Sequence, residues 1–175
     1  MKKLLFPIFA LIVLASSCTE PAYKLTDADA YPAILTFPKE YQGVYIKEKD
    51  SLIVMANRYR TVAVNTDIPK NGVLGSGGDD ILKKHGNYYV MYSRFGNDGF
   101  YRLRFFSREK SELVVKMISE VNSIEAIKTM AISFTETEDA DGMGSSQYYF
   151  TINGKILDKL MDQYLVEEFR LIKVK

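Results

Sequence analysis

The chain has 175 residues, of which 47% are hydrophobic and 13% aromatic, and its formal net charge is +1. This composition is typical of a globular protein and excludes a largely disordered chain, while the balanced charge argues against nucleic-acid binding, which usually needs a basic stripe. Cys18 is the only cysteine, so no disulfide can form within the chain.

The first seventeen residues predict an export signal. Lys2 and Lys3 form a basic start, and the apolar run 4–14 that follows is shorter than the roughly 20 residues that a membrane-spanning helix needs. Three small residues, 15–17, then lead to Cys18. Removal of this signal takes both lysines away and changes the net charge from +1 to −1.

This arrangement resembles the lipobox of bacterial lipoproteins, in which a diacylglyceryl group is attached to the cysteine sulfur and the preceding peptide is removed. The resemblance implies that Cys18 is the lipid attachment site and that the protein is anchored in a membrane of the cell envelope. Thr19 stands where an aspartate retains Gram-negative lipoproteins at the inner membrane, which implies the outer membrane. The alternative is an ordinary secretory signal that is cut near Ser17 and leaves a free thiol.

Three regions are expected along the chain. Residues 1–17 are the signal peptide, and residues 18–36 are the lipidated cysteine and a flexible tether, because Pro21 and Pro32 interrupt a stretch without helical or strand periodicity. Residues 37–175 form a single β-rich globular domain, long enough to bury a core.

The domain begins with segments rich in β-branched and aromatic residues at 41–47 and 52–65, which predict strands. A clear hairpin follows at 88–106, with residues 97 and 98 at its tip. This register places Arg94 opposite Tyr101 and Tyr92 opposite Leu103, and puts an apolar set on the inward face. The alternate face, which includes Met91, is expected to meet solvent.

The remaining segments complete the prediction. Strands are expected at 111–118, 131–135 and 147–152, with a short helix at 119–130, and the spacing of apolar residues over 156–164 predicts an amphipathic helix before a final strand at 167–174. The fold class is therefore mostly β, an antiparallel barrel or strongly curved sheet of about eight strands with a C-terminal amphipathic helix before the last strand.

The segment Tyr41–Tyr45, which reads "YQGVY", resembles the Gly-x-Trp motif that opens the first strand of lipocalins, with Tyr45 in place of the Trp. The resemblance implies a lipocalin-like body. In such a barrel Tyr92, Arg94 and Tyr101 would lie together at the mouth, where the guanidinium could pair with a carboxylate or another anion of a ligand. The alternative is that Arg94 is a rim residue and the tyrosines are packing residues.

Other motifs point to no catalytic or metal site. His85 is the only histidine, and beside Lys83 and Lys84 it is interpreted as a solvated turn residue. The glycine-rich stretch 72–80 lacks the Lys-Ser/Thr ending of a phosphate-binding loop, and the acidic stretch 136–147 lacks acids at the first and last calcium-ligand positions, so that both are interpreted as surface loops.

Two classes of function remain, and no enzyme activity, cofactor, metal or nucleic acid is expected. The first is a lipid-anchored interaction or structural module of the cell envelope that docks on an envelope protein. The second is a lipocalin-like binder of a small apolar or amphipathic ligand. A binder needs a partly unfilled interior, whereas large side chains dominate the predicted inward face and favour the first class.

Overall fold

The computed structural model describes residues 20–48, 50–62, 71–75, 80–96, 98–118, 123–138 and 146–174. Short 3₁₀ turns occur at Ala28–Ala30 and Lys39–Tyr41. The helices are α1 (Ile124–Met130) and α2 (Gly154–Tyr164). The strands are β1 (Ala22–Leu25), β2 (Gly43–Lys47), β3 (Asp50–Val54), β4 (Arg58–Val62), β5 (Asn71–Val73), β6 (Asp80–His85), β7 (Tyr88–Phe95), β8 (Phe100–Glu109), β9 (Glu112–Ile118), β10 (Ser133–Glu138), β11 (Ser146–Ile152) and β12 (Leu165–Lys173).

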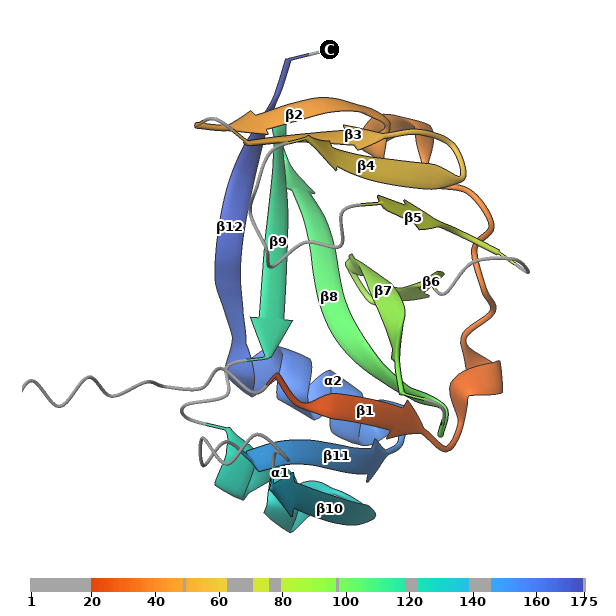
Figure 1. Cartoon of the computed structure of the whole chain (residues 1–175), viewed down its shortest axis with the longest axis vertical. Coiled ribbons are helices and arrows are strands. Elements are labelled where there is room, and N and C mark those ends of the chain that lie inside the picture. Colours follow the sequence, from red (N-terminus) through yellow and green to blue (C-terminus); the bar gives the residue numbers. More distant parts are fainter. Residues whose placement is uncertain are drawn as a thin grey trace, which may run out of the picture.

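These strands form one twelve-stranded sheet, so that the mostly β prediction is confirmed. The main order is β10-β11-β1-β8-β9-β12-β2-β3-β4-β5, and β7 and β6 continue from the other edge of β8. Among the described strand pairs, β1 and β11 are parallel and the others are antiparallel. An isolated parallel bridge joins Leu74, just after β5, to Asp80 at the start of β6, and the sheet is not closed into a barrel (Figure 1).

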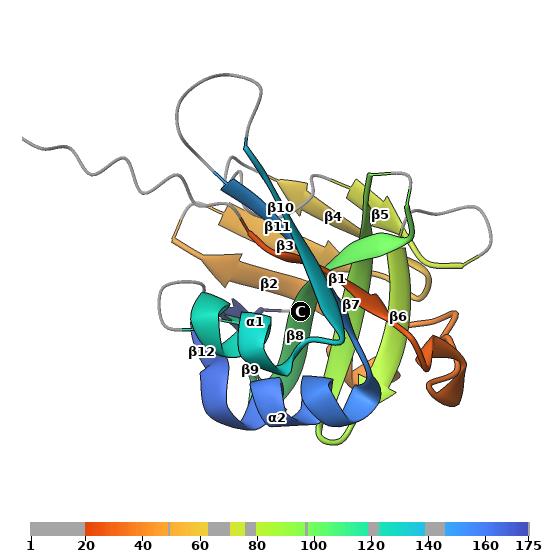
Figure 2. The same cartoon turned by 90° about the horizontal axis from the view of Figure 1, so that it is seen from below.

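The central strands β7, β8 and β9 are buried on both faces. On β7, Met91 belongs to a core cluster shared with β2, β3 and β4, whereas Val90 and Tyr92 belong to a second cluster with α1, α2, β1 and β11. The first cluster lies toward the strands at the top of Figure 1, and the second toward the layer at the bottom, which Figure 2 shows from below. Successive side chains along these strands therefore point alternately into one core cluster and the other, and not alternately into a core and into solvent.

This arrangement corrects the predicted faces of the hairpin. Its register is as predicted, with Arg94 opposite Tyr101 and Tyr92 opposite Leu103. However, the apolar face packs against the helices, and the part of the alternate face around Met91 lines the interior of the curled sheet. The prediction that Met91 meets solvent was wrong because side chains of β2, β3 and β4 cover it, whereas Arg102, on the same face nearer the hairpin tip, is 40% exposed.

The segment predicted as a flexible tether is packed from residue 20 onward. β1 lies between β11 and β8, and Ala22 and Tyr23 are buried. Farther along, Ile34 forms a bridge with Leu82 of β6. This segment shows no periodicity because β1 has only four residues and pairs with strands far along the chain.

The C-terminal helix and the final strand form as predicted. Asn153 caps α2 by accepting a hydrogen bond from the backbone N of Ile156 at 3.0 Å, and Leu157 and Leu160 are buried one turn apart on its inner face. β12 then runs between β9 and β2, so that the last strand is central in the sheet.

Candidate functional site

The predicted ligand residues lie along one face at the hairpin end, with different exposure. Tyr92 is buried, Tyr101 is half-buried, and Arg94 is exposed. The rings of Tyr92 and Tyr101 meet edge to face with centroids 5.9 Å apart. This face belongs to the helix-covered core and not to the interior of the curled sheet. Cys18, the predicted lipid attachment site, lies outside the described residues.

A buried polar cluster surrounds the only histidine. The Nε2 atom of His85 lies 2.7 Å from the hydroxyl oxygen of Tyr92, and the ring of Tyr31 covers the imidazole with centroids 4.0 Å apart. Burial lowers the pKa of His85 to about 4. The prediction of a solvated turn residue was wrong, because His85 ends strand β6 underneath the N-terminal segment.

A small apolar cavity lies inside the curled sheet. Its volume is about 30 Å³, enough for about two water molecules, and the surface that its wall exposes is entirely apolar. The lining comes from β3, β4, β7, β8, β9, β12 and the segment before β2. It comprises Phe37, Tyr41, Leu52, Val54, Tyr59, Tyr89, Met91, Arg104, Phe106, Leu113, Val115 and Phe169.

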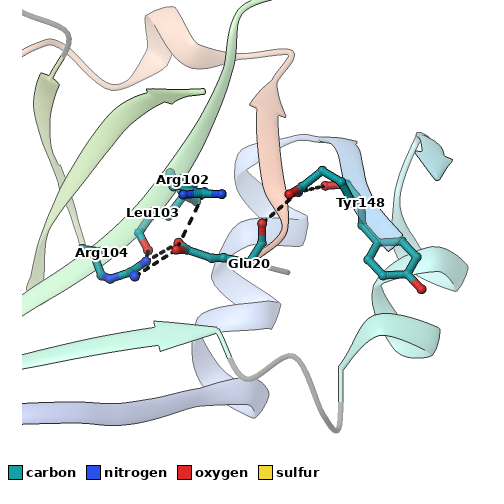
Figure 3. Close-up of polar contacts among 6 residues, drawn as sticks. Glu20, Arg102, Leu103, Arg104 and Tyr148 are labelled. Atoms are coloured by element: carbon teal, nitrogen blue, oxygen red, sulfur yellow. Dashed lines mark hydrogen bonds and ion pairs between the residues drawn. The ribbon is translucent and has the colours of Figure 1, made fainter. Parts of the chain in front are cut away.

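One carboxylate fixes the start of the described chain to β8. The Oε2 atom of Glu20 lies 2.9 Å from Nη2 of Arg104, and the other carboxylate oxygen accepts a hydrogen bond from Nη1 of Arg104 (Figure 3). The Nε atom of Arg102 lies 3.9 Å from Oε2 of Glu20. The side chains of Glu20 and Arg104 are only 17% and 13% exposed, so that this ion pair is shielded from water. We call Glu20 with Arg102 and Arg104 the N-terminal junction.

The backbone of Glu20 is held as well. The side-chain amide of Gln147 on β11 donates to the carbonyl oxygen of Glu20 at 2.9 Å. β8 and β11 therefore both hold the chain at Glu20, two residues before β1 begins. A bidentate, partly buried pair of this kind is stronger than an exposed ion pair.

Sequence reasoning missed the N-terminal junction and the cavity. Glu20 and Arg104 are 84 positions apart, and no spacing rule links them. The cavity was missed because Met91 and Arg104 were assigned to a face that meets solvent. The one available signal was that this face also carries Tyr89 and Phe106, which are poor candidates for full exposure.

The two loop motifs fall partly outside the described residues. In the glycine-rich stretch 72–80, residues 76–79 lie outside, while Gly72 is in β5 and Asp80 starts β6. The Asp80 carboxylate accepts hydrogen bonds from Tyr59 at 2.9 Å and Ser93 at 2.6 Å, which ties β4, β6 and β7 together. Most of the acidic stretch, 139–145, is also outside. Within the described residues no group of three or more His, Cys, Asp or Glu could hold a metal ion.

No family model, curated protein or solved structure matches this chain. Among the described residues, neither helix has the length and hydrophobicity to cross a membrane.

Proposed function

We propose that this protein is a lipid-anchored component of the bacterial outer membrane whose body is a non-catalytic interaction or structural module. The signal-like stretch that ends at Cys18 supports the anchor. The observation that carries the choice of module is the filled interior of the curled sheet. Its cavity of about 30 Å³ is far below the roughly 300–1,000 Å³ of a typical small-molecule pocket.

The anchor is tested at its attachment atom. Because the sulfur of Cys18 would carry the diacylglyceryl group, Cys18→Ser should abolish labelling with a fatty-acid analogue and release the protein from the membrane fraction. Ser17→Ala keeps the sulfur and serves as the matched control. Labelling that persists in Cys18→Ser would refute the lipid anchor.

A lipocalin-like binder of a small apolar or amphipathic ligand is the second candidate. The observation in its favour is that the only polar side chains around the cavity, those of Arg104 and three tyrosines, expose no polar surface to it. An apolar cavity of this kind stays dry and can take an apolar group. A ligand of ordinary size would require the side chains that line the cavity to move apart.

A further inference from the structure

Aromatic and cationic side chains gather on one surface beside the start of the described chain. The ring of Tyr149 lies 5.2 Å from that of Phe100 and 5.9 Å from that of Phe95, measured between centroids. Arg102 covers Phe95 with its guanidinium carbon 4.1 Å from the ring centroid, and the Nζ atom of Lys24 lies 5.8 Å from that of Phe100. We call these five residues the aromatic–cationic surface.

These residues share one face of the sheet. Phe95 pairs with Phe100, Ala22 pairs with Tyr149, and the neighbours in alternate positions, Tyr23 and Phe150, point into the helix-covered core. The surface therefore faces away from α1 and α2. Its three rings are half-exposed, Lys24 is exposed, and the Arg102 side chain is 40% exposed.

The surface is continuous with the N-terminal junction. Arg102 contacts both Phe95 and Glu20, which is where the described chain begins. Cys18 is two residues earlier, and two extended residues span at most about 7 Å. Because Glu20 is fixed by Arg104 and Gln147, a lipid on Cys18 would enter the bilayer close to this surface.

We propose that the aromatic–cationic surface lies against the headgroup region of a bilayer that contains anionic lipids. This inference rests on the proposed lipid anchor and adds the orientation of the body. Half-exposed aromatic rings are favoured at the membrane–water interface, and arginine and lysine next to them attract anionic headgroups.

The chain has no tryptophan, so that a single introduced tryptophan reports its own depth in the membrane. The mature lipidated protein carrying Phe100→Trp is reconstituted into vesicles of phosphatidylethanolamine and phosphatidylglycerol that contain acyl-brominated lipid, which quenches tryptophan fluorescence on contact. Ile172→Trp, at a site 55% exposed on β12, is the matched control. Tyr149→Trp replaces Phe100→Trp where the latter does not unfold cooperatively.

The expected result is quenching that is several-fold stronger for Phe100→Trp or Tyr149→Trp than for Ile172→Trp, and that weakens in vesicles without phosphatidylglycerol. Equal quenching at all positions, or stronger quenching at Ile172→Trp, would overturn the proposed orientation while the protein remains lipidated and bound to vesicles. Absence of lipid on Cys18 by mass spectrometry would instead refute the anchor itself. Protection of Phe100→Trp by a co-purified protein in place of quenching would assign the surface to a protein partner and overturn the inference.

Discussion

His85 is held neutral by its surroundings. Burial is the largest cause of its lowered pKa, and it outweighs the nearby carboxylate of Asp158, which acts in the opposite direction. The pH dependence of stability follows from the protonation of His85 in the folded and in the unfolded chain. Above about pH 6.5 both the folded and unfolded chains carry a neutral imidazole, whereas between about pH 6.5 and about 4 only the unfolded chain takes up the proton.

We therefore expect the free energy of unfolding to fall as the pH drops from 6.5 toward 4, by on the order of 2–3 kcal/mol over the whole window. Urea unfolding at pH 7 and pH 5 measures this loss. His85→Gln is the control, because it removes the titrating group and should show a smaller loss over the same interval. Equal losses in the parent and in His85→Gln would mean that His85 is protonated in the fold.

The burial of single polar side chains could not be predicted from the sequence. The pattern showed that His85 stands beside two lysines, but its burial comes from Tyr31 in a segment more than fifty positions earlier. In the same way, nothing in the sequence showed that Asp80 receives hydrogen bonds from both Tyr59 and Ser93. Local spacing does not encode contacts between distant segments.

At the scale of elements, β12 should be indispensable. It pairs with β9 along most of its length and with β2 near its end, and it buries Phe169 and Leu171. Loss of two large core side chains, at about 2–5 kcal/mol each, approaches the 5–15 kcal/mol total stability of a typical domain. Deletion of 167–175 should therefore give a protein that aggregates or is rapidly digested.

Limited proteolysis and circular dichroism measure this outcome. Deletion of only residues 174 and 175 is the control and should leave the fold intact, since Val174 is exposed and follows the last paired residue of β12. Cooperative melting of the longer deletion near the parent's temperature would contradict the central position of β12.

Elements with strong local signals were predictable. The residues at the tip fixed the β7–β8 register, and the spacing of Leu157 and Leu160 identified α2. β1 was missed because its four residues form a parallel pair with β11, about 127 positions away, and parallel pairing leaves no hairpin signal. The candidate site was only partly predictable: Tyr92 and Tyr101 do meet, but the sequence could not show which layer covers them.

For the whole molecule, the two function classes predict different responses to a fluorescent fatty acid. The filled interior predicts no saturable binding by the parent body, because a cavity of about 30 Å³ cannot hold an acyl chain. Arg94 is exposed and outside the cavity lining, so that Arg94→Met should leave the titration unchanged and alter stability by less than about 0.5 kcal/mol.

Saturable binding of the fatty acid would favour the ligand binder over the interaction module. Binding that weakens in Arg94→Met would place a carboxylate-bearing ligand at the hairpin end. Binding that instead disappears in Leu52→Phe, which fills the cavity, would show that the cavity widens to admit a ligand. Either result would favour the binder over the interaction module.

The fixed N-terminal segment also bears on how such a body would search for a partner. Glu20 and β1 are held by β8 and β11, so that a lipid at Cys18 would allow the body few tilts relative to the membrane. A domain on a flexible linker meets membrane neighbours in many orientations, most of them unproductive. With the proposed anchor, the tilt would instead be selected once, when the chain folds, and successive encounters in the membrane plane would differ mainly in position and in rotation about the membrane normal.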